Sequence, residues 1–370
     1  MTKLMLAATA ALGALTVAQP AFAERPGDKI PGSYICVFNN SVSRGAVQAE
    51  ANRSAQAAAA QLKHVYTHAL RGFAVNASEQ GIANMKANNP SIAYCEQDQV
   101  ITSGPVQVVG APGGMTAQAQ ETPWGIARVG GGASGTFATA WVIDTGIDPS
   151  HPDLNVDTAR SRTFIGKNST PWDQHGHGTH VAGTIAAKND TNGVVGVAPG
   201  AKVVAVRVLD RRGSGANSGV IAGVDYVAQV GQAGDVANMS LGGGVSTALD
   251  TAVVNAAAGG VRFALAAGNE SDNANNHSPG RANGPNVYTV SAFAVGDTWA
   301  SFSNYGNPPI DYAEPGVSIK STYLGGGYAT MSGTSMATPH LSGLLLAGAV
   351  RAGGAVSGDP AAPADTIGVH

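Results

Sequence analysis

Charged side chains are scarce in this chain of 370 residues. They make up 12% of the sequence, about half of the share near 25% that is usual for soluble domains. The formal net charge is only −3, and glycine is abundant at 50 residues. This balance excludes a highly charged disordered chain and the basic surface of a nucleic-acid-binding protein. We therefore expect a globular, loop-rich protein that binds no nucleic acid.

Cysteine is almost absent. Cys36 and Cys95 are the only two, so the larger part of the chain after residue 95 cannot use a cysteine nucleophile. Their wide spacing is not the CxxC pattern of a metal or redox site. If the protein is exported, the two could form a disulfide.

No apolar run is long enough to cross a bilayer comfortably. The run Leu4–Val17 follows the positive Lys3 and precedes an A-x-A-like sequence at Ala21–Ala23. This arrangement is typical of a secretory signal peptide at 1–23, with a membrane anchor as the alternative. The second run, 341–350, is also too short. We expect a secreted, extracellular protein with no membrane contact after signal cleavage.

The segment 24–101 predicts a small α+β domain. Strands are predicted at 33–38, 65–70, 73–77 and 92–101, and helices at 42–64 and 78–88, with Ser78 as an N-cap. The order β-α-β-β-α-β is the split βαβ, or ferredoxin-like, arrangement. A small independent enzyme domain is the alternative, but this segment contains no catalytic constellation.

The remainder divides into a linker, a large α/β region and a tail. Residues 102–122 are rich in Gly, Pro, Gln and Thr, as in an exposed linker. From 123 to 350, short apolar runs alternate with helical patterns, which predicts a doubly wound, mostly parallel sheet with helices on both faces. Ligands bind such sheets beyond the carboxyl ends of the strands. Residues 351–370 form a short C-terminal tail.

Asp144 ends the predicted strand "AWVID", where such a crevice would open. An ordinary turn residue is the alternative. The string "DTG" also occurs in aspartic proteases, but their chemistry needs two carboxylates that share one site. No second DTG or DSG exists in this chain, so that class is disfavoured.

Three histidines, His175, His177 and His180, lie within "HGHGTH". A zinc-binding helix places histidines at i and i+4 with a glutamate between them, whereas His177 and His180 are at i and i+3 without one. A metal site is therefore the weaker alternative. An imidazole at the start of the predicted helix "THVAGTIAAK" suits a general base that activates a weak nucleophile.

Ser335 begins a predicted helix in "MSGTSMATPH". An N-cap is the simpler interpretation, but backbone N–H groups at a helix start also suit a developing oxyanion. The order Asp144, His177, Ser335 is not the Ser-Asp-His order of α/β-hydrolases. Asn269, at the end of "VRFALAAGN", could donate its amide to the same oxyanion, with a turn asparagine as the alternative.

Taken together, "WVIDTGID", "HGTHVAGTIAA" and "SGTSMATPH" resemble the three signatures of the subtilisin-like serine proteases. The order Asp, His, Ser is also that of subtilisin. "SFSNYG" and "PWGIARV" are similar to the proteinase K-like branch. The resemblance covers residues 123–350, and 24–101 resembles the inhibitory propeptide that precedes many of these enzymes.

The resemblance implies a secreted serine endopeptidase with broad, apolar-leaning specificity and a monomeric form. His177 would be the base, His175 and His180 structural, and Asn269 the oxyanion donor. Backbone at 213–215 and 240–243 would pair with an extended polypeptide substrate, and 266–268 would line the pocket for the residue before the cut bond, with no acidic residue there. The implied substrate-binding residues are Gly213, Ser214, Gly215, Ser240, Leu241, Gly242, Gly243, Ala266, Ala267 and Gly268.

The resemblance also implies a structural calcium site and no organic cofactor. "HGTHVAGTIAAKNDTNGVVGVAP" matches the pattern of a helix followed by an ion-binding loop, with a solvated loop as the alternative. The implied ligands are Gln120, Asp153, Lys188, Asp190, Asn192 and Val194. Such a set supplies the six or more oxygens that Ca²⁺ prefers.

The same resemblance implies how the protein matures. The mature enzyme would start at Ala117 or Ala119 after self-cleavage, and the propeptide would remain bound as an intramolecular inhibitor and folding aid. Its first and last strands would be neighbours, so Cys36 and Cys95 could pair. Two features depart from the family. The chain ends soon after the Ser335 helix, where relatives usually add another helix, and Glu314 stands where a small residue is usual.

Two other functions stay open at this stage: a non-catalytic binding protein on the same scaffold, and an esterase that uses the same acyl transfer. Labelling of Ser335 by a fluorophosphonate would separate both enzymes from the binding protein. Cleavage of casein would then separate the protease from the esterase.

Overall fold

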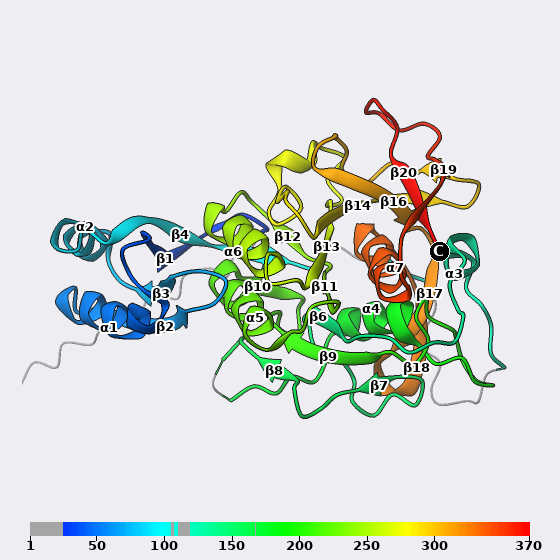
Figure 1. The fold of residues 1–370 in the computed structure, drawn as a ribbon, viewed down its shortest axis with the longest axis horizontal. Helices are drawn as coiled ribbons and strands as arrows, with labels where there is room; N and C mark the ends of the chain where they lie inside the picture. Colours follow the sequence, from blue (N-terminus) through cyan, green and yellow to red (C-terminus); the bar gives the residue numbers. More distant parts are fainter. Residues whose placement is uncertain (1–24, 105–106, 110–118, 167) are drawn as a thin grey trace, which may run out of the picture.

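The computed structural model describes residues 25–104, 107–109, 119–166 and 168–370. The predicted signal peptide and Ala117 of the predicted maturation site lie outside these residues. Among the described residues, no helix is both long and apolar enough to cross a membrane. The chain forms a large α/β body with a smaller N-terminal domain projecting from one side (Figure 1).

The α/β body is built on an 11-stranded sheet, ordered β19-β20-β16-β14-β13-β11-β6-β9-β7, with β15 and β8 attached to β14 and β9. Its strands are β6 (Ala140–Asp144), β7 (Asn155–Val156), β8 (Arg162–Thr163), β9 (Lys202–Arg207), β11 (Val236–Met239), β13 (Arg262–Ala266), β14 (Val287–Ala294), β15 (Thr298–Trp299), β16 (Ile310–Pro315), β19 (Arg351–Ala355) and β20 (Thr366–Val369). The central pairs are parallel. The predicted fold class is confirmed.

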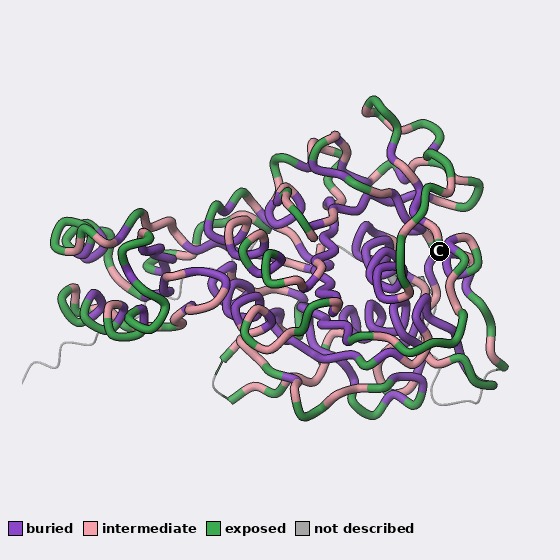
Figure 2. Tube along the Cα trace, in the orientation of Figure 1, coloured by how far each residue is buried: buried purple, intermediate pink, exposed green. Residues whose placement is uncertain are grey.

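Both faces of the sheet are buried by helices, which is why its strands read as continuous apolar runs. In β6, Trp141 and Ile143 join the core that includes α5 (Asn217–Val230) and α6 (Thr247–Ala257). Ala140 and Val142 join the core on the other face, with α4 (His177–Ala186) and α7 (Thr334–Ala347). Figure 2 shows α4, α7 and the central strands almost wholly buried.

The N-terminal domain has the predicted order, with the sheet order β4-β1-β3-β2 of a ferredoxin-like fold. Its elements are β1 (Lys29–Phe38), α1 (Val47–Ala57), β2 (Gln61–Tyr66), β3 (Gly72–Asn76), α2 (Glu79–Asn88) and β4 (Ile92–Thr102). The side chain of Ser78 caps α2 by accepting a hydrogen bond from Gly81 N at 3.0 Å.

Several predicted boundaries in this domain were wrong. The strand predicted at 33–38 begins earlier, at Lys29. The helix predicted at 42–64 ends at Ala57, since Ala59 takes a positive φ of 50° and the chain turns into β2. The strand predicted at 65–70 ends at Tyr66. The backbone N–H groups of the three residues that follow Tyr66 donate to the Asp225 carboxylate of α5 instead of to a neighbouring strand.

Cys36 and Cys95 face each other in the antiparallel pair of β1 and β4 and form a disulfide. The predicted pairing is therefore confirmed. The bond joins the first and last strands of the N-terminal domain, which are neighbours in its sheet.

The N-terminal domain docks on the first turns of α5 and α6. The N-cap position of α5 has no side-chain cap of its own, and Asp98 supplies one by accepting from Ser218 N at 3.0 Å. Glu96 acts in the same way on α6, accepting from the Ser246 hydroxyl and from Ala248 N at 3.3 Å. Carboxylates are favourable there because the first N–H groups of a helix lack intrahelical partners.

The tail at 351–370 forms part of the main sheet. β19 and β20 make an antiparallel hairpin, and Ile367 of β20 pairs in parallel with Ala313 of β16. Within the described residues, this hairpin follows α7 in place of the further helix that is usual in the family. A β-carbon on Gly368 would lie 2.3 Å from Glu314 Oε1, so the hairpin covers that fully buried carboxyl group.

Candidate active site

Asp144 and His177 form a buried pair at the carboxyl edge of the sheet. Asp144 is the last residue of β6, and His177 is the first residue of α4. His177 Nδ1 lies 2.8 Å from Asp144 Oδ1 and 2.9 Å from Oδ2, and both side chains are fully buried. A carboxylate on Nδ1 holds the tautomer that leaves Nε2 as the basic nitrogen.

The loop before α4 orients this imidazole. Gly176 has a φ of 104°, and a β-carbon there would lie 2.2 Å from the Tyr323 ring. Asp173 Oδ1 accepts from the backbone of His175 and Gly176 at 2.9 Å. The first turn of α4 can therefore begin only with glycine at position 176, which places the side chain of His177 next to Asp144.

Of the other two histidines of the motif, His180 has a structural role, whereas the role of His175 stays a prediction. His180 is fully buried, and its Nε2 lies 3.0 Å from Ile319 O and 3.1 Å from Ala329 O. Burial, aided by the nearby His177, lowers the pKa of His180 to about 3, so its ring is neutral. Burial also lowers the pKa of His175. Within the described residues, no group of three His, Cys, Asp or Glu side chains could hold a metal.

Ser335 is the second residue of α7, and its side chain is oriented toward the cleft. Its hydroxyl lies 3.3 Å from both Ser103 O and Ser240 O. Among the described residues, nothing hydrogen-bonds to His177 Nε2. The structure thus makes the predicted carboxylate–imidazole contact. The Ser335 hydroxyl contacts a carbonyl of the N-terminal segment and forms no hydrogen bond with the imidazole.

Asn269 follows β13, and its amide is held in one orientation. Its Oδ1 accepts from Thr334 N at 2.8 Å and from Thr334 Oγ1 at 2.9 Å. The same hydroxyl accepts from Gly268 N at 3.2 Å. A β-carbon on Gly104 would lie 3.3 Å from Asn269 Nδ2, so the amide donor points toward the chain in the cleft. Thr334 is a positioning residue that sequence reasoning missed.

The backbone predicted to pair with substrate is already paired with β4. β10 (Ser214–Ala216) lies on one side of β4, and β12 (Gly242–Gly243) lies on the other, both antiparallel. Ser103 N continues this ladder by donating to Gly213 O at 3.0 Å. In this structure, therefore, the extended strand between β10 and β12 belongs to the same chain, and pairing of this backbone with a separate substrate stays a prediction.

A small pocket adjoins Ser335 at the end of this strand. Its lining includes Leu241, Ala266, Gly268, Asn269 and Glu270. The expectation that no acidic residue lies there was wrong. Glu270 is adjacent in sequence to Asn269, and its carboxylate is held by Asn304 Nδ2 at 2.6 Å. Its place directly after the predicted oxyanion donor was the signal that could have identified it.

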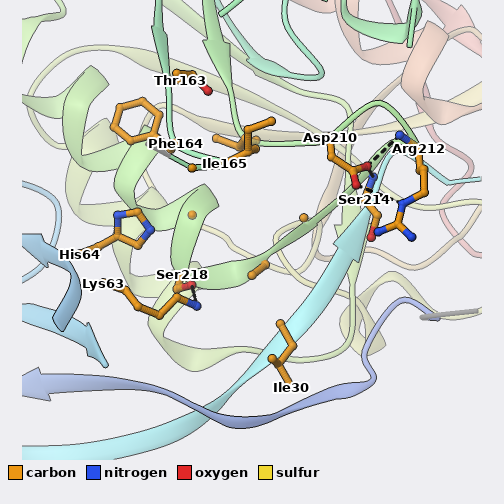
Figure 3. Close-up of a pocket in the computed structure, with 15 residues that line it drawn as sticks. Ile30, Lys63, His64, Thr163, Phe164, Ile165, Asp210, Arg212, Ser214 and Ser218 are labelled. Carbon is orange, nitrogen blue, oxygen red and sulfur yellow. Dashed lines mark hydrogen bonds and ion pairs between the residues drawn. The ribbon is translucent and has the colours of Figure 1, made fainter. Parts of the chain in front are cut away.

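A larger cavity of about 600 Å³ lies beside β10, between the two parts of the molecule. Lys63 and His64 of the N-terminal domain line one side, and Phe164 and Asp210 line the other (Figure 3). Burial lowers the pKa of His64 to about 4, and the charge of Lys63 adds to this. None of the Asp144, His177 and Ser335 side chains lines this cavity, so it belongs to the interface between the two parts.

The residues predicted to bind calcium adjoin one another. Gln120 Nε2 donates to Lys188 O at 2.9 Å, and the Asp153 carboxylate accepts from Lys188 N and Val194 N at 3.1 and 3.2 Å. Asp190 Oδ1 accepts from Asn192 N at 2.7 Å. Burial, together with the charge of Asp190, raises the pKa of Asp153 to about 6. The Asp153 carboxylate and the Lys188 carbonyl, which this loop brings together, are oxygen ligands of the kind that Ca²⁺ prefers.

Comparisons with known proteins identify the family of this chain. Residues 140–348 match the subtilase family. The chain is 40% identical over 297 residues to alkaline serine exoprotease A of Vibrio alginolyticus, covering 77% of this chain but only 52% of that protein. It is also 40% identical over 336 residues to the extracellular serine proteinase of Thermus sp. (strain Rt41A), covering 85% of this chain and 80% of that protein.

Among solved structures, a cold adapted subtilisin-like serine proteinase is similar, with a TM-score of 0.58 and 41% identity. The match covers 66% of this chain and 96% of that structure. The sheet order, the Asp144–His177 pair and the family match over residues 140–348 point to one assignment. The chain belongs to the subtilase family and is a serine endopeptidase.

Proposed function

We propose that this protein is a secreted endopeptidase in which Asp144, His177 and Ser335 form the catalytic triad. The observation that carries the proposal is the buried carboxylate–imidazole pair beside a cleft in which Ser335 contacts the carbonyl of an extended strand. His177 Nε2 takes the proton of the Ser335 hydroxyl, which attacks the substrate carbonyl carbon. An acyl-enzyme then forms and is hydrolysed by water. Secretion is supported by the extracellular relative and by the predicted signal peptide.

Oxyanion stabilisation is assigned to Asn269 Nδ2 and to backbone N–H at the start of α7. Thr334 holds the Asn269 amide with its oxygen turned away from the cleft. Because this orientation exists before substrate binds, the donor costs little reorganisation during the reaction.

We propose apolar-leaning specificity for the residue before the cut bond. Leu241, Ala266 and Gly268 give the pocket a small, mostly apolar lining. Glu270 adds a carboxylate, which disfavours acidic substrate side chains by charge repulsion. Peptide nitroanilides that differ only at this position test the preference, and efficient cleavage after glutamate would contradict it.

The N-terminal domain is proposed to be an inhibitory propeptide and folding aid of a self-processed zymogen. It fills the cleft with β4, and it caps two helices of the α/β body through Asp98 and Glu96. By blocking the cleft the domain would inhibit the enzyme, and by stabilising the two helices it would assist folding.

A structural calcium ion is proposed at Gln120, Asp153 and the 188–194 loop. The ion would neutralise the adjacent carboxylates and tie the segment before α3 (Trp124–Val129) to the end of α4. Chelation by EGTA should then lower the Tm of the mature enzyme. An unchanged Tm would count against the site.

Covalent labelling tests the assignment of the nucleophile. A fluorophosphonate should label the processed enzyme at Ser335, and the Ser335→Ala protein should remain unlabelled. The labelled enzyme should also hydrolyse casein. Labelling without casein hydrolysis would favour an esterase, and no labelling of the processed protein would favour a non-catalytic binding protein.

A further inference from the structure

The strand in the cleft ends at the nucleophile. Thr102 pairs with Ser214 of β10 and with Gly242 of β12, so it is held by backbone on both sides. Ser103 is 3% exposed and continues the ladder through its bond to Gly213 O. The next carbonyl along the chain, Ser103 O, is the one that Ser335 Oγ contacts at 3.3 Å.

The chain is also anchored on the far side of this carbonyl. β5 (Gln107–Val109) pairs in antiparallel register with β18 (Gly327–Ser332), with Gln107 opposite Ser332. β18 leads directly into α7, which carries Ser335. Two stretches of backbone, one before and one after the Ser103–Gly104 bond, are thus fixed by strand pairing.

The neighbouring bonds are less suited to cleavage. The Thr102–Ser103 bond lies within the ladder, and the N–H of Ser103 donates to Gly213 O. The Gly104–Pro105 bond is a tertiary amide whose proline ring crowds the preceding residue. The Ser103–Gly104 bond combines contact with Ser335 and a secondary amide, and Gly104 lies beside the Asn269 donor.

We propose that Ser335 cuts this chain between Ser103 and Gly104. The inference rests on the proposed function and names the first bond that the enzyme cleaves in itself. It differs from the start at Ala117 or Ala119 that the family resemblance implied. The first product would retain the β5 segment on β18, and a start at Ala117 or Ala119 would require a second, later cut.

The step begins with rotation of the Ser335 hydroxyl from Ser103 O toward His177 Nε2. The oxygen then bonds to the Ser103 carbonyl carbon while its proton passes to His177. The carbon–nitrogen bond to Gly104 breaks, and the proton moves from His177 to the Gly104 nitrogen. This leaves an ester between Ser103 and Ser335, which water hydrolyses to a Ser103 carboxylate and a free Ser335 hydroxyl.

A time course of maturation of the full chain tests the proposal. The earliest large fragment, identified by N-terminal sequencing and intact mass, should begin Gly-Pro-Val-Gln, and its partner should end at Ser103. An earliest fragment that begins at Ala117 or Ala119, with no Gly104 species before it, would overturn the proposal.

Two variants sharpen this experiment. Gly104→Pro converts the scissile bond into a tertiary amide and should abolish the Gly104 fragment, whereas Ala117→Pro/Ala119→Pro should leave that first fragment unchanged. If the double variant removes the first fragment, the proposal fails. The time course of the parent chain decides the question even if Gly104→Pro does not fold.

The same samples separate this inference from the proposed function. A processed enzyme that reacts with fluorophosphonate and cleaves casein, but never shows the Gly104 terminus, would refute only the cleavage site. A Ser335→Ala chain that still produces the Gly104 fragment when purified alone would refute self-processing by Ser335.

Discussion

Asp144 contacts the His177 ring through both carboxylate oxygens in a position that solvent does not reach. An amide in its place could donate to Nδ1 and so stabilise the tautomer with its proton on Nε2. That tautomer cannot accept the proton of Ser335.

Asp144→Asn should therefore lower kcat by about 10⁴ with the fold intact. Hydrolysis of a chromogenic peptide measures the loss, and circular dichroism checks the fold. Asp157→Asn is a matched control, because Asp157 pairs with Arg160 outside the cleft, and its kcat should equal that of the parent. A similar loss in both variants would contradict the assigned role.

Asn269 is expected to act only when charge develops on the substrate oxygen. Asn269→Ala should lower kcat by about 10²–10³ with little change in KM. Thr334→Val removes the hydroxyl but keeps the backbone N–H that donates to Asn269 Oδ1, so kcat should fall less than in Asn269→Ala. Asn275→Ala, at an exposed position in a short 3-10 helix, should not alter kcat. A change confined to KM would argue against an oxyanion role.

Glu314 is a residue whose burial has no compensating contact. Both of its oxygens are buried and have no hydrogen-bond partner among the described residues. Burial raises its pKa well above the ordinary value of 4.5, and the charge of Arg128 opposes this only in part. The folded protein therefore retains a proton that the unfolded chain releases above its own pKa. Stability contributed by this group falls as the pH rises.

Glu314→Gln removes this titration while keeping the size of the side chain. In the Ser335→Ala background, which prevents self-digestion, the Tm of the variant minus that of the parent should become more positive from about pH 5 to about pH 9. Thermal unfolding followed by circular dichroism measures it. A difference independent of pH would show that Glu314 is ionised or solvated in the folded protein.

At the scale of elements, α5 illustrates a helix completed by another domain. Asp98 accepts from the backbone and hydroxyl of Ser218, and Lys63 lies 3.3 Å from the same carboxylate. A hydrogen bond to a charged group contributes about 1.5–3 kcal/mol, which corresponds to about 10–100-fold in an equilibrium constant.

Asp98→Asn should therefore weaken inhibition of the mature enzyme by the added N-terminal domain by about 10–100-fold. Inhibition constants from peptide hydrolysis measure the effect. Glu79→Gln, on the exposed surface of α2, should leave the constant unchanged. Equal inhibition by the Asp98→Asn domain and the parent domain would show that this cap contributes nothing to binding.

At the scale of the whole molecule, the only disulfide lies in the N-terminal domain. Both cysteines precede residue 123, so the α/β body has none. Closing a loop of this kind contributes about 2–4 kcal/mol to the stability of a domain.

Cys36→Ala/Cys95→Ala should lower the free energy of unfolding of the N-terminal domain by about 2–4 kcal/mol. The Tm of the mature enzyme should not change. Urea unfolding of the Ser335→Ala precursor measures the loss of stability in the N-terminal domain. Reduction of the parent precursor by dithiothreitol breaks the same bond and should have the same effect as the double substitution. The processed enzyme in dithiothreitol provides the control. A loss of stability in the mature enzyme would contradict the assignment of these cysteines to a removable domain.

The chemistry and the fold class could be predicted from the sequence because both depend on local signals. Apolar runs that alternate with helical patterns predicted a parallel sheet covered on both faces, and Trp141 and Ala140 do pack on opposite faces. Asp144, His177 and Asn269 were recognised because strand ends and helix starts converge at one edge of such a sheet. The pairing of Cys36 with Cys95 followed from the expected strand order.

Tertiary structure decided what depends on contacts between distant segments. The helix predicted at 42–64 became part helix and part strand, because strand pairing outweighed the helix propensity of an alanine-rich run. Glu270 entered the pocket lining, and Ser103 came to lie against Ser335, through packing of segments far apart in the chain. Sequence patterns record local preferences, whereas hydrogen bonds between residues 100 or more positions apart exist only once the chain has folded.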